Sequence, residues 1–160
     1  MREKSAAVIR QMQEGDIDKL FASFERWYKP RQKFQRYWVE QQRGERVILV
    51  AWDGETVVGY TTLVWQSGYE PFKRQGVPEI VDLNVMTEHQ RRGIGTQLIR
   101  ATEEIAIQHS RLTIGISVEQ VGTHLAANRL YPKLGYVPDG NGITPRDNEL
   151  HLIKRLRPAE

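Results

Sequence analysis

A short turn containing two glycines has the residue types for one defined chemistry, the binding of an anion. Gly93 and Gly95 are separated by one residue and lie between an expected strand and an expected helix. Glycine lets the backbone bend so that successive N–H groups point at one spot, and the N-terminal end of a following helix adds partial positive charge there. Arg91 and Arg92 bring two further positive charges. The turn is therefore either an anion-binding site or a plain strand-to-helix connection with surface arginines, and the two glycines alone favour the plain connection.

Two common nucleotide-binding patterns do not fit this turn. A Walker A loop has lysine and then serine or threonine directly after its last glycine, whereas Gly95 is followed by Thr96 and Gln97. The dinucleotide-binding pattern requires a third glycine or alanine three residues after the second, and Leu98 stands there. Neither pattern is predicted.

Residue type and spacing also exclude other familiar catalytic centres. The chain has no cysteine, which excludes disulfides, thiolate metal sites and a cysteine nucleophile. A serine hydrolase elbow requires Gly-x-Ser-x-Gly, but residues 115–119 are Gly-Ile-Ser-Val-Glu. The histidines lack the paired spacing of a metal site, so we expect no bound metal. They are His89, His109, His124 and His151.

The elements that position the turn follow from the apolar periodicity. Apolar residues at three- and four-residue intervals predict helices, and β-branched or alternating runs predict strands. The expected helices are 17–24 with Asp16 as N-cap, a segment after Pro30, 96–110, and 123–134 ending at Gly135. The expected strands are 6–10, 46–52, 56–65, 79–86, 112–118 and 150–156.

The connections complete this arrangement. Asp53-Gly54 predicts a tight hairpin turn between the second and third strands. Residues 67–78 and 135–145 are expected to be long loops, with a short strand near Tyr136 as an alternative in the second. The order of elements predicts a mixed sheet with helices on both faces.

Composition is that of an ordinary globular protein. The 160 residues suit one domain, which we expect to span 1–160. Twenty-three lysines and arginines against 20 acids give a net charge of +3, far from the profile of a dedicated nucleic-acid binder. The longest apolar run, 47–52, is much shorter than the roughly 18 residues of a membrane span. The first residues lack the apolar region of a secretory signal.

Two motifs make the sequence similar to one enzyme family. The pattern Gln/Arg-x-x-Gly-x-Gly occupies residues 90–95 and follows Leu83-Asn84-Val85 on the expected strand. Residues 127–136 are Ala-Asn-Arg-Leu-Tyr-Pro-Lys-Leu-Gly-Tyr. They resemble the Ala-x-x-Leu/Phe-Tyr-x-x-x-Gly-Phe/Tyr signature at the end of the fourth helix of the GNAT superfamily of acetyl-CoA-dependent N-acetyltransferases. With the element order, the resemblance covers essentially the whole chain.

The resemblance implies a fold and a cofactor site. The fold would be α/β (α+β), with a central mixed, mostly antiparallel sheet, helices on both faces, and a splayed parallel pair formed by 79–86 and 112–118. Acetyl-CoA would be the co-substrate. Backbone N–H groups of the turn would hold its pyrophosphate, and the main chain of the preceding strand would hold the pantetheine arm. The cofactor-binding residues so implied are Leu83, Asn84, Val85, Gln90, Arg91, Arg92, Gly93, Ile94, Gly95, Thr96, Asn128 and Tyr131.

Two catalytic side chains are also implied. Tyr131 matches the tyrosine that often protonates the departing CoA thiolate, and a core tyrosine at a helix end is the alternative. The family often uses an acid on the central strand as the base for the acceptor amine. Glu79 is preferred to Asp82, with water or another group as the remaining alternative. In a regular strand Glu79 shares a face with Leu83, and Asp82 faces the other way.

One position departs from the family. Seven residues before the tyrosine the family frequently carries an asparagine that bonds the pantetheine, and His124 stands there. Asn128 lies one turn along the same helix face and is the expected substitute. Pro132 removes a helical N–H and is expected to bend the last turn.

Residues 26–38, RWYKPRQKFQRYW, carry five positive charges and no acid. Such a segment is either a docking surface for nucleic acid or an acidic substrate, or an amphipathic helix, and we prefer the helix. In the family this region borders the acceptor pocket, so the charge would select a carboxylate-bearing acceptor or guide the CoA phosphates. The helix would bury Phe34, Tyr37 and Trp38 and leave Arg31, Lys33 and Arg36 in solvent.

The sequence therefore predicts a cytoplasmic N-acetyltransferase that moves the acetyl group of acetyl-CoA to a primary amine of a small molecule or protein. Direct attack is favoured because no cysteine can carry the acyl group. The alternative is a GNAT-like CoA-binding regulatory or nucleic-acid-binding module without transferase activity. We expect acetyl-CoA and an amine as partners, neither membrane nor nucleic acid, and a homodimer, which is frequent in the family.

Overall fold

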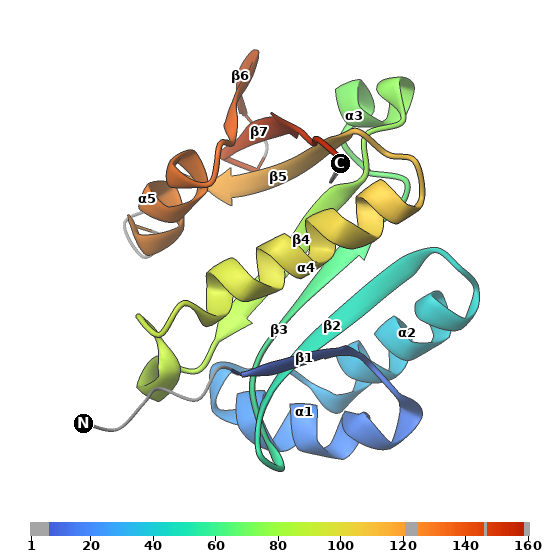
Figure 1. Cartoon of the computed structure of the whole chain (residues 1–160), viewed down its shortest axis with the longest axis vertical. Helices are drawn as coiled ribbons and strands as arrows, with labels where there is room; N and C mark the ends of the chain where they lie inside the picture. The colour runs from blue at the N-terminus through green and yellow to red at the C-terminus, as the bar shows by residue number, and fades with distance from the viewer. Residues whose placement is uncertain (1–6, 121–124, 146, 159–160) are drawn as a thin grey trace. The chain divides into compact units, whose positions relative to one another are not determined.

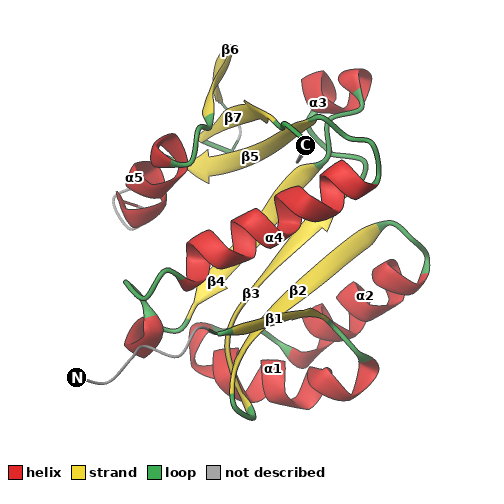
Figure 2. Cartoon of the chain, in the orientation of Figure 1, coloured by secondary structure: helices red, strands yellow, loops and turns green. Residues whose placement is uncertain are grey.

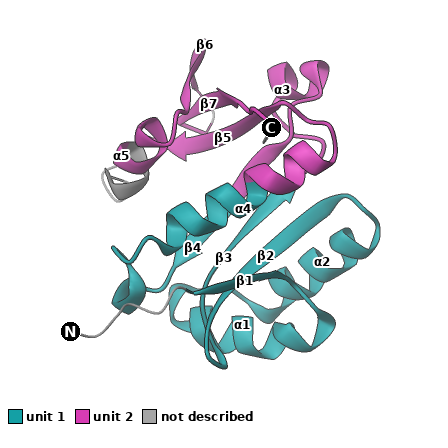
Figure 3. Ribbon diagram, viewed as in Figure 1, with its two compact units in different colours: residues 1–63, 82–102 teal, residues 64–81, 103–160 magenta. Residues whose placement is uncertain are grey.

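The computed structural model describes residues 7–120, 125–145 and 147–158 (Figures 1 and 2). Its seven strands form a sheet in the order β1-β2-β3-β4-β5-β7-β6. The chain divides into two compact units, one made of 1–63 and 82–102 and the other of 64–81 and 103–160 (Figure 3). Strands β3 and β4 and helix α4 contribute residues to both units.

The first unit contains the N-terminal strands and helices. Strand β1 pairs with β2 antiparallel, from Val8 opposite Trp52 to Gln11 opposite Leu49. The hairpin between β2 and β3 turns at Gly54, whose φ is +61°, as the Asp-Gly pair predicts. Its elements are β1 (Val8–Gln11), α1 (Ile17–Phe24), α2 (Arg31–Gln42), β2 (Arg46–Asp53), β3 (Thr56–Val64), most of β4 (Glu79–Val85) and the start of α4 (Ile94–Gln108).

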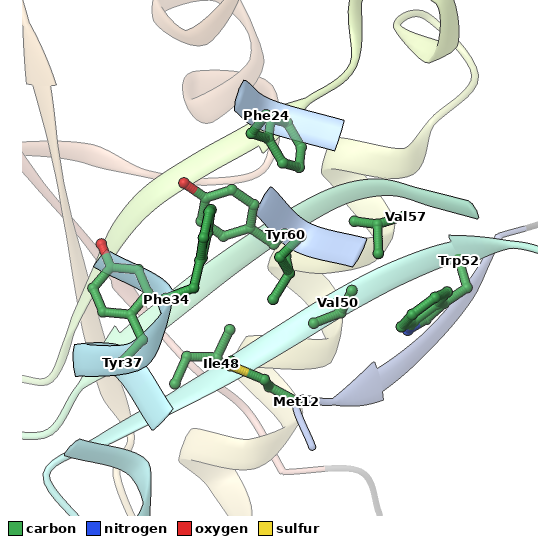
Figure 4. Packing of buried hydrophobic residues seen from close by; sticks show 10 residues of the cluster. Met12, Phe24, Phe34, Tyr37, Ile48, Val50, Trp52, Val57 and Tyr60 are labelled. Carbon is green, nitrogen blue, oxygen red and sulfur yellow. The ribbon is translucent and has the colours of Figure 1, made fainter. Parts of the chain in front are cut away.

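Aromatic side chains form the centre of the first unit's core (Figure 4). Phe24 and Phe34 pack edge-to-face on Tyr60, with ring centroids 5.0 and 5.4 Å apart. Phe34 lies between the rings of Tyr37 and Tyr60, whose hydroxyl groups point to the same side of the cluster (Figure 4). Because buried hydroxyl groups require hydrogen-bond partners, this side of the core needs a polar acceptor.

The second unit contains the C-terminal strands. Strand β5 pairs with β7 antiparallel over seven residues, from Thr113 opposite Arg155 to Glu119 opposite Glu149. Strand β4 pairs with β5 in parallel, and β6 pairs with β7 with an irregularity between Pro138 and Ile143. Its further elements are α3 (Glu70–Gln75), β5 (Thr113–Glu119), α5 (Leu125–Lys133), β6 (Val137–Thr144) and β7 (Glu149–Arg155).

This arrangement confirms the expected fold class, a mixed, mostly antiparallel sheet with one parallel strand pair. The expectation of one domain over 1–160 stays a prediction. In the ranges that the structure describes, no helix combines the length and apolar character that a membrane crossing requires.

The two expected long loops are wrong. Residues 70–75 form α3, with Pro71 near its start and Gly76 at φ +67° as its terminator. Residues 137–144 form the strand considered as the alternative near Tyr136, although their glycine-rich sequence favours a turn. Pairing with β7 overrides that local preference, which is common at an irregular edge strand.

Helix ends differ slightly from the sequence expectation. Helix α4 begins at Ile94, two residues before the expected start. The expected start of the fourth helix, at 123, lies outside the described residues. Asp16 precedes α1 as expected, but its carboxylate accepts hydrogen bonds from Arg10 and from the N–H of Gln13 instead of capping the helix.

Candidate functional site

The segment between β4 and α4 is held to the end of the strand by hydrogen bonds. The backbone N–H of Met86 donates to Val58 in β3, at 2.8 Å, and the N–H of His89 donates to Met86, also at 2.8 Å. The side-chain amide of Gln90 donates to the carbonyl of Val85, at 3.0 Å. Gln90, expected to bind the cofactor, therefore uses its side chain to tie the turn to the strand.

The glycine turn presents unpaired backbone donors. Gly93 has a φ of +80°, and its carbonyl accepts the first helical bond, from Gln97 at 2.9 Å. The N–H groups of residues 94–96 thus belong to the first helical turn, where no helical acceptor is available. Within the described ranges, no other protein group accepts from them. An anion placed at this helix start would receive these hydrogen bonds and the favourable end of the helix dipole.

The space beside the turn is open. A Cβ atom added to Gly93 would meet no heavy atom within 4 Å. Arg91 and Arg92 are exposed at the same turn, and an Arg92 guanidinium nitrogen lies 3.3 Å from Nδ1 of His89. The positive φ values of Arg91 and Gly93, +67° and +80°, show that the backbone reverses here as the sequence predicts. That the turn holds the pyrophosphate implied by the family resemblance stays a prediction.

The strand that leads into the turn, β4, pairs with β5 only at its beginning. The parallel ladder with β5 consists of Glu79 opposite Gly115 and Ile80 opposite Ile116. Asp82 then has a φ of +67°, far from extended geometry, and Leu83 to Val85 continue toward the turn outside that ladder. The backbone of Leu83 to Val85, expected to bind the pantetheine arm, therefore lies on an edge that the ladder with β5 does not use.

Gly59 in β3 is a residue that the sequence analysis did not single out. A Cβ atom there would lie 3.0 Å from the carbonyl oxygen of Asn84 and 3.3 Å from Cδ1 of Leu98. Only glycine lets β4 and α4 approach β3 this closely. Gly59 therefore helps to place the strand and the helix on either side of the turn.

The carboxylate of Asp82 is densely hydrogen-bonded within the first unit. Its side chain is 11% exposed, and five side chains surround its two oxygens. At Oδ2 lie the hydroxyls of Tyr37 (2.8 Å) and Tyr60 (2.7 Å) and the Nζ of Lys33 (2.8 Å), and at Oδ1 the amide of Asn84 (2.7 Å) and the Nζ of Lys29 (3.1 Å).

These partners decide the protonation state of Asp82. Burial alone raises the pKa of a carboxyl, but the hydrogen bond from Lys33 and the charges of Lys29 and Lys33 outweigh it and hold the pKa of Asp82 well below its usual range. Burial and the charge of Asp82 raise the pKa values of Tyr37 and Tyr60, so both hydroxyls remain donors. Asp82 is therefore a stable anion and a weak base at neutral pH.

The alternation argument for Glu79 and Asp82 does not hold in the structure. It assumed an extended strand, whereas the positive φ of Asp82 interrupts the regular alternation of side chains. Asn84, expected to bind the cofactor, directs its side-chain amide to Asp82. Its main chain remains part of the strand that precedes the turn.

Glu79 lies in a separate polar cluster, in the second unit. Its side chain is buried, and its carboxylate accepts hydrogen bonds from the hydroxyls of Ser67 and of Ser117, the latter at 3.1 Å. The His151 ring is stacked on Tyr69 at 3.5 Å, and Tyr69 donates to Asp139 at 2.7 Å. Burial lowers the pKa of His151, against the opposing charges of nearby acids, so its imidazole is mainly neutral at pH 7.

Tyr131, the other expected catalytic residue, lies near the end of α5. It is 5% exposed, and its ring centroid is 6.2 Å from that of Tyr136. Burial raises the pKa of Tyr131, so its hydroxyl stays protonated well above neutral pH. The N–H of Tyr136 donates to the Tyr131 carbonyl, and the hydroxyl of Tyr136 donates to Glu103. Asn128 lies in α5 but its side chain is outside the described part, as is all of His124.

The basic segment is only partly as expected. Phe34 and Tyr37 are buried, but Trp38 is half-buried, and Lys33 is not solvated, because it packs against Asp82. No sequence signal pointed to the pairing of Lys29 and Lys33 with an acid about 50 residues away. The other cations of the segment also face acids, in the pairs Arg26–Glu88, Arg31–Asp18 and Arg36–Glu40.

The sequence profile of the acetyltransferase (GNAT) family matches residues 14–136. The match covers more than half of the chain, so the chain belongs to this acetyltransferase family. Among curated proteins, no sequence matches it significantly.

Solved structures share the fold at low sequence identity. PaiA N-acetyltransferase from Thermoplasma acidophilum in complex with coenzyme A is 16% identical, with a TM-score of 0.72 over 94% of this chain and 99% of that one. Ribosomal-protein-alanine N-acetyltransferase from Brucella melitensis is 20% identical (TM-score 0.73; 93% and 99% covered). An aminoglycoside 6'-N-acetyltransferase complexed with coenzyme A is 20% identical (TM-score 0.69; 96% and 99%). The names of the last two refer to different acceptors, so the shared fold leaves the acceptor open.

The Asp82 network generates a prediction about stability and pH. We expect Asp82→Asn to lower the free energy of unfolding at pH 7 by about 3 kcal/mol, because it leaves two ammonium groups without their carboxylate. The folded-state pKa of Asp82 is below its unfolded value of about 3.9, so its contribution to stability is fully present above that value and is lost progressively as pH falls below it toward the folded-state pKa. Between pH 7 and pH 3, the free energy of unfolding measured with urea should therefore fall less in the variant than in the wild type.

The matched control is Glu88→Gln, which removes the carboxylate of an exposed ion pair with Arg26. It should change the unfolding free energy much less, because exposed pairs contribute little. Equal effects of the two substitutions would contradict the special role of Asp82.

Proposed function

We propose that this chain transfers the acetyl group of acetyl-CoA to a primary amine by direct attack of the amine on the thioester. The observation that carries the proposal is that the N–H groups of residues 94–96 have no acceptor among the described residues and lie beside open space, in a chain of the acetyltransferase family. Acetyl-CoA supplies an activated acetyl thioester. The residues of the chain bind it, position the acceptor and move two protons.

The binding role falls to the turn and to the strand before it. The backbone N–H groups from Arg91 to Thr96 hold the pyrophosphate, and the two arginines add long-range attraction. The main chain of Leu83 to Val85 holds the pantetheine arm by hydrogen bonds of the kind that an added strand makes. Holding thioester and amine together contributes about 7–11 kcal/mol to the barrier reduction, so positioning is the larger part of catalysis.

The base role falls to Glu79. Its carboxylate is buried and held by the hydroxyls of Ser67 and Ser117, which supports a base with a fixed position. Asp82 is the poorer candidate because its partners hold its pKa well below the usual range. A positioned base contributes about 10²–10⁴ in rate.

The acid role falls to Tyr131. Its hydroxyl stays protonated at neutral pH because burial raises its pKa, and it makes no hydrogen bond to the residues that the structure describes. A protonated donor beside the departing sulfur stabilises the thiolate, whose conjugate thiol has a pKa near 8.5. Asn128 is the proposed partner of the pantetheine amides.

The rival function, a CoA-binding regulatory or nucleic-acid-binding module, is the weaker proposal. The five cations of residues 26–38 face four acids of the same chain, which reduces the charge available to a nucleic acid. A single domain, a cytoplasmic location and a homodimer are proposed on the family resemblance alone. Release of free thiol from acetyl-CoA with a panel of primary amines tests the transferase function directly, and its absence with every amine would favour the rival.

Substitution of Gly93 tests the cofactor site. We expect Gly93→Val to weaken CoA binding at least about 100-fold, because the side chain enters the open space beside the turn and strains a φ of +80°. Gly44→Val is the matched control, since Gly44 also has a positive φ (+73°) and open surroundings. Calorimetric titration with CoA should separate them, and equal affinity of the two variants would refute the site.

Substitution of Tyr131 tests the acid. We expect Tyr131→Phe to lower kcat about 10- to 100-fold while CoA affinity changes little. In the wild type, kcat should not fall between about pH 8 and pH 9.5, because the raised pKa keeps this hydroxyl protonated. Tyr136→Phe, which removes the donor to Glu103, should instead reduce stability. An unchanged kcat in Tyr131→Phe would remove this residue from the mechanism.

Substitution of Glu79 tests the base. We expect Glu79→Gln to lower kcat/KM for the amine about 100-fold at pH 7. The deficit should shrink as pH rises, because more of the amine is then already unprotonated. Glu149→Gln is the control for local charge, because the charge of Glu79 and burial together raise the pKa of that neighbouring acid. A deficit that is independent of pH, or equal in the control, would argue against proton transfer to Glu79.

A further inference from the structure

Two ammonium groups in the first unit share one carboxylate. The Nζ of Lys29 lies 3.1 Å from Oδ1 of Asp82, and the Nζ of Lys33 lies 2.8 Å from Oδ2. The lysine side chains are only 21% and 22% exposed. Over the described ranges, Asp82 is the one carboxylate within ion-pair distance of either lysine. One positive charge therefore remains without a counter-charge in a poorly solvated place, which is costly unless a ligand supplies one.

Asp82 cannot compensate further, because its oxygens are already occupied. Tyr37, Tyr60 and Asn84 donate to the same two oxygens, which gives five donors for about four acceptor sites. Each ammonium group has three N–H donors, of which Asp82 uses one or two. Burial lowers the pKa of Lys33, and the neighbouring charge of Lys29 adds to this effect while Asp82 opposes it. The lysine pair thus retains hydrogen-bond donors that Asp82 does not use.

The lysine pair stands beside the strand that the proposed function assigns to acetyl-CoA. Asp82, which both lysines contact, directly precedes Leu83 to Val85, the stretch proposed to hold the pantetheine arm. Lys29 precedes α2 by two residues, and Lys33 lies in the first turn of that helix. In the proposed function the pyrophosphate lies at the turn that follows Val85, so the pantetheine arm runs back along the strand and its acyl end lies toward Asp82. A small acceptor at the acyl end would therefore come close to two ammonium groups.

We propose that Lys29 and Lys33 bind a carboxylate of the acceptor, so that the acceptors are small primary amines carrying a carboxylate, the chemistry of free amino acids. This inference rests on the proposed acetyl transfer. The excess of one positive charge matches a monoanion, and ammonium–carboxylate hydrogen bonds are among the stronger ones in proteins. The other source of negative charge is a phosphate of CoA itself, and the experiment separates the two.

The test compares matched acceptors that differ in one charge. Thiol release from acetyl-CoA is measured with a panel of amino acids and with the corresponding amino acid amides. The amides keep the primary amine and the side chain but lack the carboxylate. Lys29→Gln and Lys33→Gln should each lower kcat/KM for the acids at least tenfold and leave that for the amides within about threefold. Lys33→Arg, which keeps the charge, should restore part of the difference.

Arg36→Gln is the matched control. It removes a cation from the same helix, but this arginine is 63% exposed and pairs with Glu40. It should leave the ratio of kcat/KM for the amino acids to kcat/KM for the amides unchanged. Each single lysine variant keeps one ammonium group on Asp82, so we expect all of them to fold, and urea unfolding checks this.

Three results would overturn the inference. The first is an acid-to-amide ratio that is the same in the wild type and both lysine variants. The second is a loss of CoA affinity in the variants as large as the loss of kcat/KM, which would assign the lysines to a CoA phosphate. The third is that neither the amino acids nor their amides cause thiol release although CoA binds, which excludes both as acceptors. A chain that does not bind CoA contradicts the proposed function itself.

Discussion

The arrangement of the first unit depends on the buried carboxylate of Asp82. A strand residue with a positive φ and a largely buried charge beside an aromatic core are both unfavourable unless the surroundings compensate for them. The hydroxyls of Tyr37 and Tyr60 and two ammonium groups supply this compensation. One anion therefore links α2, β3 and β4 by hydrogen bonds, in addition to the apolar contacts of Phe24 and Phe34.

The same residue divides β4 into two parts with different tasks. Before Asp82, Glu79 and Ile80 pair with β5 in a parallel ladder. After it, the strand leads to the glycine turn without continuing that ladder. A ladder requires extended backbone on both strands, so a residue at φ +67° is a physical reason for it to end. A chain segment can thus be firmly paired at one end and present main-chain groups at the other.

Burial separates the roles of the positive charges. Arg91 and Arg92 are exposed at the turn, where salt screens their field, so they suit the attraction of a multiply charged ligand more than the discrimination between ligands. Lys29 and Lys33 are largely removed from solvent, where the presence or absence of one charge on a ligand has a larger effect. The arginine pair and the lysine pair thus have the same charge, but the less exposed lysine pair is better suited to discriminate between ligands that differ in charge.

The sequence by itself determined the element types, the hairpin at Asp53-Gly54, and the glycine turn, because periodicity and glycine act over a few neighbouring residues. It also indicated the family, through two motifs that are each local. It missed α3 and gave β6 only as an alternative to a loop, since pairing and packing overrode their turn-like composition. Only the tertiary structure showed that Lys29 and Lys33 meet Asp82, because no local pattern encodes a contact between residues about 50 positions apart, which arises only when the core brings their elements together.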